Sequence, residues 1–254
     1  MNFANPEVVE AIKDVMRFWF DLGVDGFRLN VAHLFYQDAT ACEHHPQTHA
    51  VHKQLRAVQD EYDQRAVVGE LLGRPEQAAA YYGDGNDELH MVFNFNLTYA
   101  MHAAGYVAHP GFIDRSLART VGIFPPGAQN VLVLASHDMP LREYDVMLRS
   151  VPRIKLMGAL MLTLPGTPFL HYGQEIGIAS VREWIVDPRD FVRTPMHWTG
   201  GEHAGFSTVG SVAGPRPELR IAKRRARSGQ PRLAAQPFQA GHRYAQPDAR
   251  PLRG

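Results

Sequence analysis

Short apolar runs alternate with longer stretches of helical spacing, and this alternation limits the fold more than any other feature of the chain. The apolar runs cover residues 24–30, 66–70, 89–95, 130–135 and 167–172. Helices are predicted at about 6–22, 50–62, 74–82, 97–120 and 151–163. Continuous apolar strands separated by helices are typical of a parallel sheet that is covered on both faces. The sequence therefore predicts an α/β fold with five parallel strands.

Composition and the length of the apolar runs predict a soluble globular protein. With 254 residues, 45% of them hydrophobic, the chain can bury a sizeable core. Charged residues such as Glu7 and Glu10 interrupt any signal-peptide pattern near the start. The longest apolar run, residues 156–164, is too short for a membrane span. A single cysteine, Cys42, rules out an intrachain disulfide and fits a reducing compartment, so we expect a cytoplasmic location.

The net charge of zero hides an asymmetry between the two ends of the chain. Residues 211–254 carry ten Lys and Arg and two acidic residues, a net charge of +8, and the rest of the chain carries −8. The Pro, Gly, Ala and Gln content of this basic tail, with few aliphatic residues, favours a disordered extension. The alternative interpretation is an arm that binds nucleic acid or another anionic surface.

The first apolar run ends in an unusual polar residue. Because side chains alternate across a strand, Gly26, Arg28 and Asn30 share one face, and Asp25 lies on the other. A guanidinium at Arg28 is well placed to hold a carboxylate two residues along by a charge-assisted hydrogen bond. Position 30, however, carries an amide.

Three of the predicted strands end in a residue that can take part in chemistry: Asn30, Glu70 and Asp138. In a βα barrel, such residues at the carboxyl ends of the strands face a common site. Two carboxylates around one sugar ring are what the cleavage of a glycosidic bond requires. Taken alone, each signal has a structural alternative, because Glu70 or Asp138 could cap a helix and His137 could be a structural histidine.

Four sequence motifs resemble the α-amylase family, glycoside hydrolase family 13, in order and rough spacing. These are Gly-Phe-Arg-Leu-Asn at 26–30, Val-Gly-Glu at 68–70, Ser-His-Asp at 136–138 and Gly-Thr-Pro-Phe-Leu-His-Tyr-Gly-Gln-Glu-Ile-Gly at 166–177. Arg-Thr-Pro-Met-His-Trp at 193–198 and Ala-Gly-Phe-Ser-Thr at 204–208 are similar to the branch of α-glucosidases, oligo-1,6-glucosidases and trehalose synthases. The resemblance runs from about residue 2 to residue 208.

The resemblance assigns roles to individual residues. Glu70 matches the general acid/base of the family, and Asp138 matches the carboxylate that stabilises the transition state. His137 matches a histidine that binds substrate, and Arg28 matches the arginine that orients the nucleophile. Asn30 falls on the nucleophile position, where the family has Asp. The implied reaction is retaining cleavage of α-glucosidic bonds in oligosaccharides, without a redox cofactor and with no metal site evident.

An amide at position 30 predicts strongly impaired catalysis. Asn30 carries no charge, so it can neither attack the anomeric carbon nor stabilise an oxocarbenium ion, and Asp25 points to the opposite face. We expect hydrolysis several orders of magnitude slower than in an intact relative. The alternative function is a protein that binds carbohydrate without cleaving it. A further residue, His33, is a candidate to line the site from the start of the following helix.

The resemblance also implies a domain organisation. It predicts a (β/α)8 TIM-barrel fold of which this chain holds about five βα units, strands 4 to 8, over residues 1–208. Two open sheet edges would make such a partial barrel prone to aggregation. Residues 209–254 are expected to be disordered or read out of frame. Residues 44–47 are predicted to form a loop. The cluster Cys42, Glu43, His44 and His45 resembles a metal site in composition, but its ligands crowd too closely for a tetrahedral ion, so we expect no zinc.

Overall fold

The computed structural model describes residues 1–181 and 187–209. The chain falls into two compact units, Met1–His197 and Trp198–Gly254. The first unit contains the whole sheet and all the α-helices in the described part of the chain. The expected basic tail lies outside the described residues, and the domain boundary predicted after residue 208 stays a prediction.

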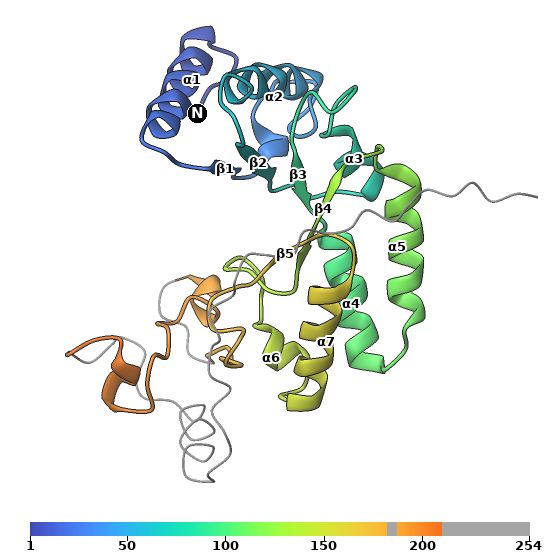
Figure 1. Cartoon of the computed structure of the whole chain (residues 1–254), viewed down its shortest axis with the longest axis vertical. Coiled ribbons are helices and arrows are strands. Elements are labelled where there is room, and N and C mark those ends of the chain that lie inside the picture. Colours follow the sequence, from blue (N-terminus) through green and yellow to red (C-terminus); the bar gives the residue numbers. More distant parts are fainter. Residues whose placement is uncertain (182–186, 210–254) are drawn as a thin grey trace, which may run out of the picture. The chain divides into compact units, whose positions relative to one another are not determined.

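A parallel five-stranded sheet organises the first unit, and its strands lie side by side in chain order (Figure 1). The strands are β1 (Gly26–Leu29), β2 (Ala66–Gly69), β3 (Met91–Phe93), β4 (Gln129–Val133) and β5 (Thr167–Phe169). Each strand falls within or next to a predicted apolar run. The prediction of five parallel strands is therefore confirmed.

Helices connect the strands, as the alternation predicted. The α-helices are α1 (Pro6–Asp21), α2 (Pro46–Gln59), α3 (Pro75–Ala80), α4 (Phe95–Val107), α5 (Gly111–Ile123), α6 (Glu143–Val146) and α7 (Val151–Thr163). Short 3-10 turns occur at Ala32–Leu34, Pro188–Phe191 and Glu202–Gly205. The first helix begins as its sequence indicates, because the Asn5 side chain accepts a hydrogen bond from the Glu7 N–H at 3.0 Å and proline suits the first helical position.

Two helix predictions were wrong in their bounds. Helix α2 begins at Pro46, within the segment predicted as a loop, because His45 Nδ1 accepts the Gln47 N–H at 3.0 Å and caps the helix. The region 97–120 is divided into α4 and α5. The break comes at Ala108, whose left-handed backbone (φ 54°) ends α4. A side-chain cap and a left-handed residue each involve only a single turn at a helix end, so neither appears in the hydrophobic periodicity of the sequence.

The sheet is apolar on both faces, which accounts for the continuous apolar runs. Val68, Phe93, Val131 and Val133 form a buried cluster on one face. Residues that alternate with these, such as Val67, pack on the other face against the helices. Strands β1 and β2 approach so closely that a Cβ on Gly26 would lie 2.0 Å from the Ala66 carbonyl oxygen.

The described part of the second unit is a short turn. The backbone N–H groups of Trp198 and Thr199 both donate to the Ala204 carbonyl oxygen at 2.9 Å. In neither unit do the described residues form a helix that is long and apolar enough to cross a membrane.

Candidate active site

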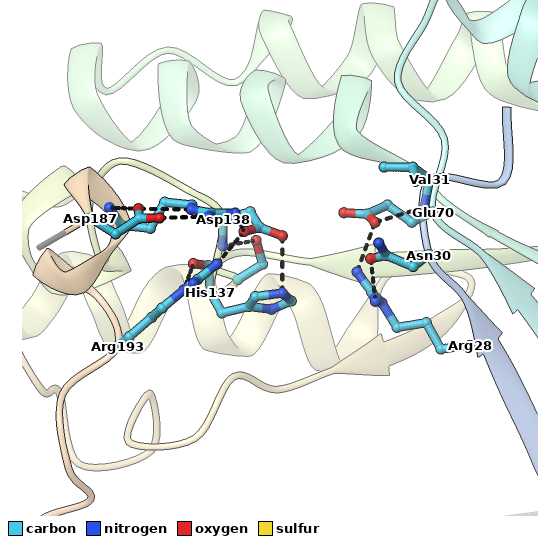
Figure 2. A network of polar contacts seen from close by, with 10 residues as sticks. Arg28, Asn30, Val31, Glu70, His137, Asp138, Asp187 and Arg193 are labelled. Atoms are coloured by element: carbon cyan, nitrogen blue, oxygen red, sulfur yellow. Dashed lines mark hydrogen bonds and ion pairs between the residues drawn. The ribbon is translucent and has the colours of Figure 1, made fainter. Parts of the chain in front are cut away.

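Arg28 joins the ends of β1 and β2. Its Nη1 donates to Asn30 Oδ1 at 2.9 Å, and its Nη2 lies 2.8 Å from Glu70 Oε2 (Figure 2). The expectation that Arg28 stands beside Asn30 is confirmed. Because a guanidinium can only donate, it fixes the amide of Asn30 with its oxygen toward Arg28.

Glu70 is the most buried member of this group, at 8% exposure. Its Oε2 accepts the backbone N–H of Val31 at 3.2 Å in addition to the contact with Arg28. Its carbonyl oxygen accepts the Ala32 N–H at 2.8 Å. Glu70 thus holds the turn that follows β1, and in that turn Val31 adopts a left-handed backbone with φ 40° and ψ 50°. Such a backbone is strained for a β-branched residue.

Asp138 is the centre of a second group, which follows β4. Its Oδ1 lies 2.6 Å from Arg193 Nη2 and 3.2 Å from Arg189 Nη1, and its Oδ2 lies 3.0 Å from His137 Nε2. Partial burial raises the pKa of Asp138, but His137 and the two arginines outweigh burial and hold the pKa below its usual range. The carboxylate is therefore ionised at neutral pH and held from three sides.

The two arginines come from the loop that follows β5. Asp187 binds Arg189 through both of its oxygens, with Nη2 at 2.6 Å from Oδ2 and Nε at 2.8 Å from Oδ1. Arg193 Nε also donates to the His137 carbonyl oxygen at 3.0 Å. Sequence reasoning did not find these two residues as site residues. Arg193 begins one of the family motifs, which was the available signal, whereas Arg189 had none.

Both groups lie at the carboxyl edge of the sheet, since they follow β1, β2 and β4 of a parallel array. Figure 2 shows Glu70 and Asn30 facing His137 and Asp138 across this edge. The four side chains predicted from strand ends and motifs are thus brought to one side of the sheet. Glu70 and Asn30 offer an anionic and a neutral hydrogen-bonding group on one side. Asp138 and His137 offer an anionic group and an imidazole on the other. Such a set can form hydrogen bonds with a polyhydroxylated ligand between them.

His33 lies close to Glu70, but its side chain is not exposed at the edge of the sheet. Its side chain is buried, with 3% exposure, and its ring packs against His44 at 5.3 Å between centroids. Burial and the neighbouring His44 lower its pKa. Direct contact between His33 and a substrate would require the turn to open. Within residues 1–181 and 187–209, no three His, Cys, Asp or Glu side chains are arranged to hold a metal ion.

A small cavity lined by residues that follow β4 and β5 has a second set of titratable residues in its wall, which sequence reasoning missed. Glu143 on α6 and His171 after β5 both line it. Burial raises the pKa of Glu143 to about 7, against a weaker opposing effect of Gln174. Burial, followed by Arg142 and then His137, lowers the pKa of His171 to about 4. Both groups are therefore favoured in their neutral forms.

A parallel sheet alternating with helices, with carboxylates after the carboxyl ends of its strands, is the architecture of βα-barrel proteins. The model of the alpha amylase catalytic domain matches residues 1–214. The chain therefore belongs to the α-amylase family, glycoside hydrolase family 13, and its sheet is the five-stranded part of a TIM barrel.

Individual relatives agree with this assignment. The trehalose synthase/amylase TreS of Mycolicibacterium smegmatis is 40% identical over 242 residues, which cover 82% of this chain and 40% of the relative. The trehalose synthase of Thermus thermophilus is 35% identical over 240 residues, 82% of this chain and 24% of the relative. The fold alone is shared with the crystal structure of the trehalulose synthase MutB from Pseudomonas mesoacidophila, which superposes with a TM-score of 0.75 at 20% identity, over 89% of this chain and 51% of that one. The chain thus spans well under half the length of these two curated relatives.

Proposed function

We propose that the carboxyl edge of the sheet binds an α-glucosyl unit of an oligosaccharide, with Glu70 in the place of the general acid/base. In this proposal Asp138 and His137 hold the hydroxyl groups of the sugar, and Asn30 lies beneath the anomeric carbon, where a nucleophile would attack. Cleavage by the chain with its own Asn30, called the parent below, is then strongly impaired, because an amide is not a nucleophile toward an acetal carbon.

The bridge from Arg28 to both Asn30 and Glu70 is the observation that carries this proposal. A guanidinium in that position would orient a carboxylate at residue 30 and an acid/base at residue 70 at once. The present amide keeps the hydrogen bond to Arg28 but contributes no negative charge. The site therefore retains the geometry for binding a glucoside while it lacks the group that would form the covalent intermediate.

Restoring the carboxylate tests the proposal directly. The variant Asn30→Asp should hydrolyse an aryl α-glucoside at least about 10³-fold faster than the parent, since removing a covalent nucleophile costs several orders of magnitude. The matched control is Asn2→Asp, the same substitution at an exposed position, which should leave the rate unchanged. Adding Glu70→Gln to Asn30→Asp should abolish the gain.

A binding measurement separates the two parts of the proposal. Calorimetric titration with maltose should show saturable binding to the parent that is lost in Asp138→Asn. Equal turnover by the parent and Asn30→Asp would contradict the role given to residue 30. No maltose binding by a folded parent would contradict the glucoside site itself.

Binding without cleavage is the second candidate function, and the retained ionic contacts of the site favour it. Glu70 and Asp138 are each held by arginine although residue 30 is an amide. In that case the parent binds maltose and releases it unchanged, and Asn30→Asp binds with the same affinity. An affinity that rises together with turnover in the variant would contradict this second candidate.

A further inference from the structure

The peptide bond between Asn30 and Val31 has a local environment that differs from that of an ordinary strand end. Strand β1 ends at Leu29. The N–H of Val31 donates at 3.2 Å to the carboxylate oxygen Oε2 of Glu70. A backbone nitrogen is therefore in direct contact with a side chain that accepts protons, one residue after an asparagine.

The side-chain carbonyl of Asn30 is polarised at the same time. Arg28 Nη1 donates to Asn30 Oδ1 at 2.9 Å, so a full positive charge lies against the oxygen of the amide. A fixed cation at this distance stabilises an oxyanion far more than it stabilises a neutral carbonyl. Glu70 and Arg28, which also pair with each other through Nη2 and Oε2 at 2.8 Å, are thus the base and the cation that nucleophilic attack on an amide carbon needs.

We propose that Asn30 is a self-processing site, at which this chain converts its own asparagine to a carboxylate by deamidation. The nitrogen of Val31 attacks Cγ of Asn30 while its proton passes to Glu70, and Arg28 holds the negative charge that develops on Oδ1. Glu70 then returns the proton to the side-chain nitrogen, the bond from Cγ to that nitrogen breaks, and ammonia leaves.

Water completes the reaction by opening the five-membered succinimide that remains. Opening at one carbonyl gives aspartate, and opening at the other gives isoaspartate. The net reaction converts one amide and one water into one carboxylic acid and one ammonia, so it requires no oxidant or reductant. The contribution of aspartate at position 30 to sugar cleavage rests on the proposed function, whereas the deamidation itself rests only on the local contacts.

The chain contains its own matched control, because the dipeptide Asn-Val occurs a second time at Asn130–Val131. There both residues lie inside β4, and Val131 is fully buried. The Oδ1 of Asn130 accepts its hydrogen bond at 3.0 Å from a neutral amide, that of Asn94. The following residue is the same at both sites, so a difference in rate between them reports the folded environment.

The test is peptide mapping by mass spectrometry during incubation of the purified full chain at neutral pH. Asn30 should deamidate at least about 10²-fold faster than Asn130, the lower limit of what a positioned general base supplies. In urea the two rates should converge. Glu70→Gln should slow the reaction at Asn30 and leave Asn130 unchanged.

Equal rates at the two sites in the folded chain would overturn the inference, as would a fast reaction at Asn30 that persists in urea. If Glu70→Gln does not fold, the two rates in the parent chain, with and without urea, still decide between these outcomes. An active Asn30→Asp variant without deamidation of the parent would reject the deamidation at Asn30 and support the proposed function. Deamidation of Asn30 to aspartate without a gain in glucoside hydrolysis would support the deamidation and contradict the proposed function.

Discussion

The buried carboxyl of Glu143 gives a pH dependence of stability that can be worked out from the structure. Burial raises its pKa from an ordinary 4.5 to about 7. Between these values the folded chain holds a proton that the unfolded chain has lost. Stability from this group is therefore fully present below pH 4.5 and is lost as the pH rises toward 7. The loss amounts to about 1.4 kcal/mol per pH unit, or about 3 kcal/mol in total.

The variant Glu143→Gln removes this titration and keeps the shape of the side chain. Its free energy of unfolding minus that of the parent should rise by about 3 kcal/mol between pH 4.5 and pH 7 and stay level above pH 7. Taking the difference cancels the contributions of all other titrating groups. Urea unfolding followed by circular dichroism at intervals of half a pH unit measures it.

His171 lines the same cavity and should give the opposite slope. Its pKa is lowered from 6.5 to about 4, so the unfolded chain binds the extra proton in that range. Stability from this group is lost as the pH falls below 6.5. The difference in the free energy of unfolding between His171→Gln and the parent should therefore fall as the pH rises from 4 to 6.5. The Glu143→Gln difference rises over the overlapping window from pH 4.5 to pH 7.

An exposed glutamate supplies the control for these two variants. Glu10 pairs with Lys13 at 2.8 Å with 60% of its side chain exposed, so Glu10→Gln should change the free energy of unfolding by less than about 1 kcal/mol. If the differences in the free energy of unfolding for Glu143→Gln and His171→Gln change with pH in the same direction, the reasoning is refuted. A Glu143→Gln difference that does not change between pH 4.5 and pH 7 would refute the burial of the charge.

Two backbone predictions concern the strands that carry the site. Gly26→Ala should lower the free energy of unfolding by about 2 kcal/mol or more, because the added Cβ meets the Ala66 carbonyl oxygen. Gly158→Ala, which adds a Cβ in open space on α7, should raise the free energy of unfolding by up to about 1 kcal/mol. Similar effects of the two variants in urea titrations would contradict the close approach of β1 and β2. Val31→Gly should stay within about 1 kcal/mol of the parent, since glycine relieves the left-handed backbone. The same change at the fully buried Val131 should cost about 3 kcal/mol, and equal losses at the two valines would argue against strain at Val31.

The strands and the neighbours of Arg28 were predictable because both follow from local rules. A continuous apolar run indicates a strand that is buried on both faces. The alternation of side chains along β1 places Arg28 beside Asn30 without any knowledge of the rest of the fold. The contact from Arg28 to Glu70 needed one further step, the pairing of neighbouring parallel strands. Each of these inferences uses a period that is written in the sequence.

Contacts made through irregular loops could not be predicted in this way. Arg189 and Arg193 reach Asp138 from more than fifty residues along the chain, and no periodicity links the loop to the strand. The left-handed backbone of Val31 could not be predicted either, because valine rarely adopts it and the contacts beside it come from Glu70 on another strand. The burial of Glu143 depends on a four-residue helix, too short to leave a pattern.

The amide at position 30 changes more than the nucleophile, because it also changes the charge that surrounds Glu70. With aspartate there, one guanidinium would be shared by two carboxylates, and the group would carry a net negative charge. With asparagine, Arg28 and Glu70 form a neutral pair. Under the proposed function, a carboxylate at residue 30 would supply the attacking group and would also compete with Glu70 for the hydrogen bonds of Arg28. The exchange of one amide nitrogen for oxygen therefore changes both the nucleophile and the ion pair beside it.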